Sequence, residues 1–322
     1  MSKFMSNAKS QGLIAGAFSA AILVCLTSCT ESAAPIPDFS GQWGRDMLNF
    51  ELPPSGPGPI VNTVRKADGT MDIEAPAGDY ISPILKPEAA EVVRKRGEIS
   101  LSGRAFPDPH NQCWPEPPPF TLAVQFGVQI LQQSDKVTLL YLADHQVRHV
   151  RMNVLHPTHV TPTWQGDSVG HYEGDTLVID TVGIKVGPLS MVDLYGTPHS
   201  EALHVIERYR LIDGVAASEA QGRHIREYDN PDGDRSNLPF EAISPFYGRG
   251  DIDPDTTKKG LQVEITVEDP GAFTTRWSGL VTYRRVKLEW PEWPEVVCAE
   301  NNTHEYYAGR DTNVPQADKP DF

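Results

Sequence analysis

The sequence lacks several features by which common classes of function are recognised. Basic residues are scarce, because 28 Lys and Arg stand against 43 Asp and Glu and the formal net charge is −15. A surface of that sign repels phosphate backbones, so nucleic acid is excluded as a partner. No glycine-rich phosphate-binding loop is evident and no nucleophile stands out. We therefore expect no cofactor.

Long helices are disfavoured by the composition. The chain has 28 prolines in 322 residues, and each proline removes a backbone donor and blocks the preceding helical turn. The apolar content is ordinary, at 39 %, so a folded protein with a sizeable core is expected.

Only one long apolar run is present, and it lies at the amino terminus. It extends from Leu13 to Leu26, which is too short to span a bilayer comfortably, and Lys3 and Lys9 precede it. The four residues Leu26-Thr27-Ser28-Cys29 then have the pattern of a bacterial lipoprotein cleavage site. This arrangement predicts export and lipid attachment.

The predicted lipoprotein has a short tether between lipid and body. Residues 1–28 are the expected signal peptide, acylated Cys29 anchors the chain to the lipid bilayer, and residues 29–38 form the tether. Thr30 follows the cysteine in place of Asp, which favours the outer membrane. The predicted location is the bacterial cell envelope, on its periplasmic or surface face.

Two cysteines remain for the folded part. Cys113 and Cys298 are the pair left after the leader is removed and Cys29 is acylated. In an oxidising compartment we predict a disulfide between them. Two separate buried thiols are the alternative.

One helix has clear start and stop signals, at about residues 87–96. Proline occupies its first position, acidic residues fill the first turn, cations fill the last turn, and Gly97 follows.

From about residue 120 the pattern is that of β-strands. The predicted strands are short and closely spaced, and hairpin turns separate several of them. We expect one mainly antiparallel β domain over residues 39–305, with a loop or lid insertion at 214–259 and a disordered tail at 306–322. A sheet closing into a barrel or half-barrel is the first choice and a β-sandwich the second.

The clearest hairpin turns at Gly174-Asp175. A two-residue turn places Tyr172 opposite Leu177, whereas a three-residue turn places His171 there. A slip of one residue reverses which side chains face inward, so the sequence leaves the orientation of His171 open.

Several segments resemble a large family of exported bacterial proteins that has no assigned activity. The central one is Trp164-Gln165-Gly166-Asp167-Ser168-Val169-Gly170, followed by Tyr172-Glu173-Gly174-Asp175-Thr176-Leu177-Val178. Further similar stretches are 198–208, 268–274 and 297–302, so the resemblance covers about residues 112–304. It implies no role for any residue. Gly41-Gln42-Trp43 also resembles the Gly-x-Trp of the first lipocalin strand, which agrees with a barrel.

Two arginines lie three residues apart on a predicted strand, and therefore on opposite faces. Arg148 and Arg151 are these residues, and the inward one needs a carboxylate or a bound anion. Either an internal ion pair with Glu207 or Asp180 braces the barrel, or the arginine binds a ligand carboxylate or enolate.

A dense polar group near one strand entrance is a candidate for acid–base chemistry. It contains His199, Glu201, Glu207 and Arg208, and His171 is a further candidate. A histidine beside a carboxylate transfers protons near neutral pH where a pocket brings the two together. The catalytic candidates are His171, His199, Glu201 and Glu207.

The remaining candidates bind ligands or metal. Arg148, Arg208, Trp164 and Tyr172 are the predicted ligand contacts. His156 and His159 have a spacing that metal sites use, but Pro157 and the β context favour loop histidines instead.

These observations favour a lipid-anchored protein that binds a small, partly apolar ligand in a barrel cavity. A cofactor-independent lyase, isomerase or hydrolase that uses histidine and glutamate in that cavity is the second hypothesis. A structural envelope lipoprotein without a ligand is the third. Protein partners are not indicated by the sequence.

Overall fold

A computed structural model describes residues 36–45, 48–72, 75–124, 126–228 and 252–287. The predicted signal peptide, Cys29, most of the tether, Cys298 and the carboxy-terminal tail lie outside these ranges. The acylation of Cys29 and the disulfide between Cys113 and Cys298 therefore stay predictions.

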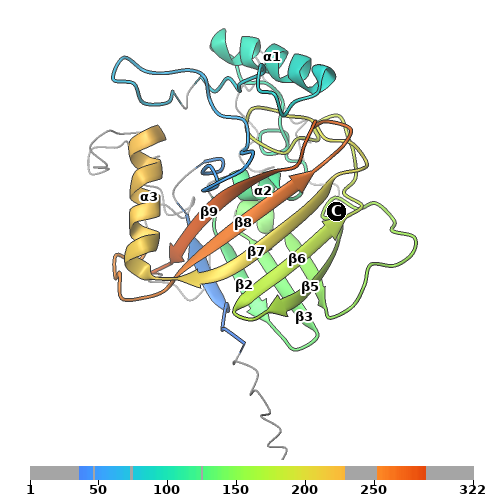
Figure 1. The fold of residues 1–322 in the computed structure, drawn as a ribbon, viewed down its shortest axis with the longest axis vertical. Helices are drawn as coiled ribbons and strands as arrows, with labels where there is room; N and C mark the ends of the chain where they lie inside the picture. The colour runs from blue at the N-terminus through green and yellow to red at the C-terminus, as the bar shows by residue number, and fades with distance from the viewer. Residues whose placement is uncertain (1–35, 46–47, 73–74, 125, 229–251, 288–322) are drawn as a thin grey trace, which may run out of the picture. The chain divides into compact units, whose positions relative to one another are not determined.

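The described residues form a closed β-barrel (Figure 1), which confirms the predicted fold class. Neighbouring strands follow chain order around the barrel, and β9 returns to β1. The strands are β1 (Gly41–Gly44), β2 (Val128–Gln132), β3 (Lys136–Tyr141), β4 (Val147–Met152), β5 (Asp167–Glu173), β6 (Thr176–Val182), β7 (His204–Ile212), β8 (Gly260–Glu268) and β9 (Trp277–Arg285).

One strand pair differs from the antiparallel expectation. β4 and β5 pair in parallel, with Val150 opposite Ser168 and Met152 opposite Gly170. Parallel neighbours need a crossover connection in place of a tight turn, and residues 153–166 supply it. The barrel is therefore mixed.

Strand β1 closes the barrel. Trp43 lies opposite Val128 of β2 and opposite Arg285 of β9. Its indole is fully buried and donates a hydrogen bond to the carbonyl of Phe39 at 2.9 Å. The guanidinium of Arg285 lies 3.8 Å from the ring centroid of Trp43, so the closing strand is held by side chains as well as by the ladder.

The β5–β6 hairpin uses the two-residue turn. Tyr172 lies opposite Leu177, which resolves the register that the sequence left open. Gly174 has φ +61°, a left-handed conformation that glycine adopts without steric cost. In this register the His171 side chain is on the exposed face.

Helix α1 (Pro87–Leu101) confirms the predicted helix and extends beyond it. Gly97 does not end the helix, because it is a site of close packing. A Cβ added there would lie 3.2 Å from the Cβ of Ala77, so the glycine lets α1 approach the neighbouring segment. The short helix α2 (Phe120–Ala123) and a 3-10 turn at Ala143–His145 lie elsewhere in the loops.

A further helix, α3 (Gly214–Tyr228), corrects the prediction of a loop or lid over residues 214–259. Asp213 caps it, because its carboxylate accepts the backbone N–H of Val215 at 2.9 Å. Ala217 is buried and packs against Gly260 of β8. Residues 229–251 of the predicted insertion lie outside the described ranges.

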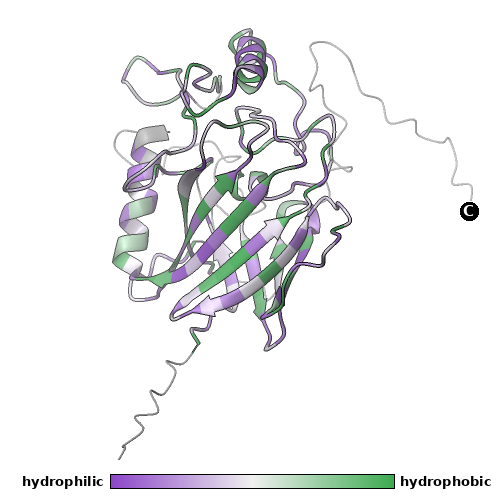
Figure 2. Cartoon of the chain, turned by 45° about the vertical axis from the view of Figure 1, so that its right-hand side comes forward, coloured by the Kyte–Doolittle hydropathy of each residue, from purple (hydrophilic) through white to green (hydrophobic). Residues whose placement is uncertain are grey.

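The core follows the alternation of the strands. Hydrophobic and hydrophilic residues alternate along the barrel wall (Figure 2), and β4 alternates strictly between exposed and buried positions. The main cluster fills the barrel, and a second cluster of seven buried residues around Phe106, Phe120 and Phe126 lies among the loops. Within the described ranges, no helix has the length and hydropathy needed to span a bilayer.

Candidate functional site

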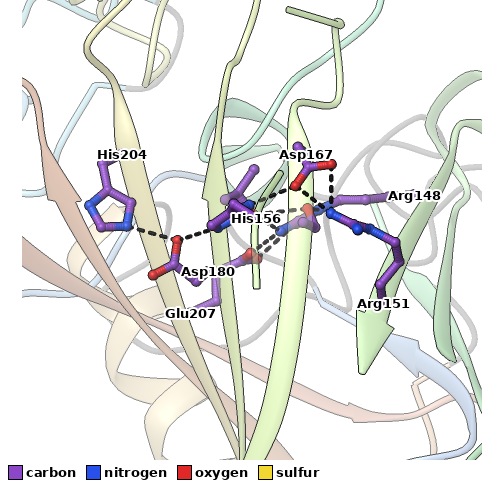
Figure 3. A network of polar contacts seen from close by, with 9 residues as sticks. Arg148, Arg151, His156, Asp167, Asp180, His204 and Glu207 are labelled. Carbon is purple, nitrogen blue, oxygen red and sulfur yellow. Dashed lines mark hydrogen bonds and ion pairs between the residues drawn. The ribbon is translucent and has the colours of Figure 1, made fainter. Parts of the chain in front are cut away.

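The barrel interior contains a buried ion pair. Arg148 on β4 is 1 % exposed and its guanidinium contacts the carboxylate of Glu207 on β7, with Nη1 lying 3.1 Å from Oε1 and Nη2 bonded to Oε2 (Figure 3). This confirms an internal ion pair and selects Glu207 over Asp180 as the partner. Arg151 is exposed, as the alternation predicted.

Every donor of the Arg148 guanidinium is engaged within the protein. An arginine has five N–H donors. Besides the bonds to Glu207, Nε donates to Ser168 Oγ at 2.9 Å, Nη2 to Thr181 Oγ1 at 2.6 Å and Nη1 to Tyr141 Oη at 3.3 Å. Glu207 also accepts a bond from Tyr209 Oη at 2.9 Å. The interior at this level is a satisfied polar core, and it leaves Arg148 no donor for a ligand.

Ser168 belongs to a Gly-x-Ser-x-Gly pattern, Gly166-Asp167-Ser168-Val169-Gly170. In α/β-hydrolases that pattern marks a nucleophile on a sharp turn between a strand and a helix. Here Ser168 lies within strand β5, is 3 % exposed, and is bonded to Arg148 and Thr181. Its hydroxyl is part of the core network rather than an exposed nucleophile.

A pocket of about 350 Å³ lies outside this core, between the end of α1, the segment that follows α1 and the β6–β7 connection. Its apolar wall includes Phe106 and Leu194. Its remaining lining residues are Leu48, Asn49, Asn62, Pro76, Ser100, Gly103, Arg104, Ala105, Asp108 and Tyr195.

Four polar side chains of the pocket keep hydrogen-bonding capacity. Asn49 Oδ1 accepts the N–H of Leu194 at 3.1 Å, and no bond joins its Nδ2 to another described residue. Arg104 donates from Nε to Ser102 Oγ at 3.0 Å, which leaves both terminal nitrogens. Ser100 Oγ has no bond within the described part of the chain, and Asp108 uses Oδ1 for the N–H of Asn111 at 2.7 Å. Burial raises the pKa of the Asp108 carboxyl.

A second buried carboxylate orders the β6–β7 connection, and an arginine of α1 binds the same segment. Asp193 is 2 % exposed, and its Oδ1 accepts the N–H groups of Tyr195 at 2.9 Å and Thr197 at 3.1 Å. Burial raises the pKa of the Asp193 carboxyl. Arg96 of α1 donates to the carbonyl of Gly196. These contacts fix the wall of the pocket that Leu194 and Tyr195 provide.

A histidine–carboxylate pair lies in the segment next to Asp108, and sequence reasoning missed it. His110 Nδ1 lies 2.8 Å from Glu116 Oε1; the glutamate is fully buried, whereas the imidazole is 41 % exposed. The Glu116 backbone is held by Gln146, whose Oε1 accepts its N–H at 2.7 Å, and by Gln165, whose Nε2 donates to its carbonyl at 3.1 Å. The two residues lie in a proline-rich loop without periodicity, so no sequence signal joined them.

Burial and pairing act against each other in this pair. Burial raises the pKa of Glu116, although the bond from His110 opposes that effect. For His110, burial alone would lower the pKa, but Glu116 and the nearby carboxylates outweigh it and the pKa is raised.

The predicted catalytic residues do not form one site. Glu207 lies in the barrel core, and Glu201 is exposed. His199 is 7 % exposed, bonds the Ser200 carbonyl through Nδ1 at 3.0 Å, and has a pKa lowered by burial. His171 is exposed and lies 3.0 Å from Glu173. Within the described ranges, no hydrogen bond or ion pair joins any two of these four residues.

The predicted ligand contacts are also dispersed. Arg208 forms an exposed ion pair with Glu173. Trp164 packs edge-on against Trp114 with ring centroids 5.3 Å apart. Tyr172 accepts a bond from Gln132 at 2.7 Å and lines a second cavity of about 350 Å³, which is next to residues 36–38.

The metal candidate His156 belongs to a polar network on the outer barrel wall (Figure 3). Its Nδ1 lies 2.6 Å from Asp167 Oδ1 and its Nε2 lies 3.0 Å from Asp180 Oδ1. His204 Nε2 shares the same Asp180 oxygen at 2.9 Å. His159 is exposed. No group of three or more histidine, cysteine or acidic residues in the described ranges is arranged to hold a metal ion.

Comparison with known proteins gives no relative for this chain. No family model matches it, and neither the curated proteins nor the solved structures contain a significant match. The resemblance of residues 112–304 to a family of exported proteins therefore stays a prediction.

Proposed function

We propose that this protein binds a small, partly apolar ligand in the pocket beside α1. The pocket itself carries the proposal, because it combines apolar walls with a few polar groups that the protein leaves unpaired, which is the usual composition of small-molecule sites. The interior around Arg148 is already satisfied by Glu207 and its neighbours, so the barrel supports the site and does not enclose it.

The unpaired groups indicate the chemistry of the ligand. Asn49 Nδ2, the Ser100 hydroxyl and the terminal nitrogens of Arg104 are all hydrogen-bond donors. A ligand head with carbonyl or carboxyl oxygens would accept from them, while Asp108 would accept from a ligand hydroxyl. Phe106 and Leu194 would contact an apolar body.

Filling the pocket tests the proposal. Ala105 is exposed and lines the pocket, so Ala105→Trp blocks it without altering the core. The exposed residue Ala202 lies on a turn that is not part of the pocket, so Ala202→Trp is the matched control. We expect the fluorescence enhancement of 8-anilinonaphthalene-1-sulfonate to be lost with Ala105→Trp and kept with Ala202→Trp. Equal enhancement with both variants would show that the probe does not occupy this pocket, and would contradict the proposal.

We also propose export to the cell envelope and attachment to the bilayer through acylated Cys29. The support is the leader sequence and the small residues before Cys29. Metabolic labelling with an alkyne palmitate, followed by membrane fractionation, is the test. Label and membrane association should both be lost in Cys29→Ser; a Cys29→Ser protein that stays labelled contradicts the proposal.

Acid–base catalysis is the second candidate, and the His110–Glu116 pair favours it. A buried carboxylate that orients a partly exposed imidazole is the arrangement used to position a general base, and Asp108 of the pocket wall lies two residues away. The test compares small-molecule extracts incubated with wild-type protein and with His110→Gln. Metabolites consumed only by the wild type support catalysis, and identical profiles oppose it.

A further inference from the structure

The crossover between β4 and β5 has few attachments to the barrel. From residue 153 to residue 163 all side chains are exposed except His156 and Val160. Within the described ranges, no backbone hydrogen bond involves residues 154–162; the nearest are those of Asn153 to Gly170 and Thr163 to Gly183. Val160 packs over Gly183, where an added Cβ would lie 2.3 Å from Val160 Cγ1. Among contacts between described residues, those of His156 are therefore the only polar ones that hold residues 154–162.

These contacts of His156 require a particular protonation state. Both ring nitrogens of His156 face a carboxylate oxygen, at 2.6 Å for Asp167 and 3.0 Å for Asp180. Ionised carboxylates only accept hydrogen bonds, and a neutral imidazole has only one N–H. Only the imidazolium form can bond both. In the neutral form a ring lone pair faces one of the two carboxylates.

The charged and titratable groups around His156 come from five strands, β4 to β8. Arg151 of β4 donates to both oxygens of Asp167, at 2.7 and 2.8 Å. On the other side, His204 of β7 bonds Asp180, and Glu268 of β8 acts on His204 electrostatically. Burial alone would raise the pKa of Asp180, but His204 and His156 lower it. Of the loop's own titratable groups, His159 is exposed.

From this geometry we propose that His156 is a proton-dependent latch that fastens the crossover loop 154–162 to the barrel wall. Protonated His156 joins the loop to β5 and β6 at once. Loss of the proton breaks one of the two bonds and leaves mainly Val160 to hold the loop. The loop is then closed while His156 carries its second proton and is released when His156 loses that proton. This proposal is independent of ligand binding in the pocket and of lipid attachment.

A nitroxide spin label at position 158 reports the state of the loop. Thr158 is exposed and lies between His156 and Val160, so Thr158→Cys accepts the label without removing an anchor. Continuous-wave EPR of the full-length protein from pH 5 to pH 9 should show a mobile component that grows as the pH rises. The expected increase in the ratio of mobile to immobile label is about tenfold, the effect of losing one charge-assisted hydrogen bond.

Three variants isolate the role of His156. The side chain introduced by His156→Gln has a single donor group, as neutral histidine does. The label at position 158 should therefore be mobile at every pH in this variant. His159→Gln, in the same loop, and His204→Gln, on the far side of Asp180, should both keep the pH dependence. Circular dichroism checks that each variant is folded. A label whose mobility does not change with pH, or a pH dependence that survives in His156→Gln or disappears in His204→Gln, overturns the proposal.

Discussion

At the scale of single residues, the Arg148–Glu207 pair is the most consequential feature of the barrel. Two charges removed from water are stable only when they are paired and their remaining hydrogen-bonding groups are satisfied. Ser168, Thr181, Tyr141 and Tyr209 meet that requirement here. Burial raises the pKa of Tyr141 to about 12, so its hydroxyl stays neutral beside the pair.

Breaking this pair should be costly. Glu207→Gln leaves the Arg148 guanidinium buried without a counter-charge, and we expect it to lower the free energy of unfolding by about 3–5 kcal/mol. Urea denaturation measures the change. The double variant Arg148→Met/Glu207→Gln should lose less than the sum of the single variants, because neither charge is then left alone.

Arg151→Met is the matched control for that cycle. Arg151 is 45 % exposed in its ion pair with Asp167, and exposed pairs contribute only about 0–1 kcal/mol. A loss for Arg151→Met as large as that for Arg148→Met, or strict additivity in the cycle, would contradict the assignment of Arg148 as a brace.

The sequence predicts part of this residue-level arrangement and misses the rest for a physical reason. Strand alternation separates Arg148 from Arg151, and it limits the inward partner to Glu207 or Asp180. Choosing between these two requires the register of β6 and β7 against β4, which alternation does not contain. The His110–Glu116 pair lies in an irregular loop. Such a loop has no periodic pattern from which contacts between side chains can be predicted.

At the scale of elements, α3 is held to the barrel by a close approach at Gly260. An added Cβ on Gly260 would lie 2.2 Å from the Cβ of Ala217, a distance that only movement of the helix can relieve. The glycine is thus required by packing, and it permits α3 to lie against β8 and β9.

Gly260→Ala should therefore destabilise the protein by about 1–3 kcal/mol, the usual cost of overpacking. Ala217→Gly alone should cost about 1 kcal/mol through lost helix propensity. Because it removes the atom that the new Cβ meets, Ala217→Gly should reduce the cost of Gly260→Ala in the double variant. Thermal or urea unfolding gives the three values. If the two costs simply add, the contact between α3 and β8 is not the cause.

Helices illustrate where sequence signals fail at this scale. The signals of α1 placed its start correctly at Pro87, but Gly97 indicated a stop that packing against Ala77 overrides. For α3, Asp213 was an available N-cap signal. The polar, glycine- and proline-rich stretch from 214 to 259 obscured it, because its average composition resembles that of a loop.

At the scale of the whole molecule, three buried carboxyls and two histidines have pKa values that folding raises, whereas burial lowers the pKa of His199. Burial raises the pKa of the Asp193 carboxyl, and the hydrogen bond that His204 donates to Asp180 raises the pKa of His204. Asp108, His110 and Glu116 also have raised pKa values. A group with a raised pKa in the folded state contributes stability below its unfolded pKa, and that stability is lost as the pH rises through the folded value.

For Asp108, Glu116 and Asp193 this loss begins above the ordinary carboxyl pKa of about 4, so we expect these three groups to lower the free energy of unfolding as the pH rises above that value. Each group that binds a full extra proton in the folded state contributes a slope of about 1.4 kcal/mol per pH unit. Urea denaturation at several pH values measures the slope. Asp193→Asn keeps an acceptor oxygen for Tyr195 and Thr197, so it should flatten the slope without unfolding the connection. Asp135→Asn, at an exposed position, is the control, and a slope unchanged by Asp193→Asn would count against buried Asp193 as a source.

The closure of the barrel has a mechanical consequence. β1 is the shortest strand; three register pairs join it to β2 and two join it to β9. It is also the strand nearest the amino terminus, so any tension applied from that side reaches this seam before any other part of the sheet. Trp43 stabilises this seam through its contacts with Phe39 and Arg285. Its removal from the core would be the first event when the protein is stretched.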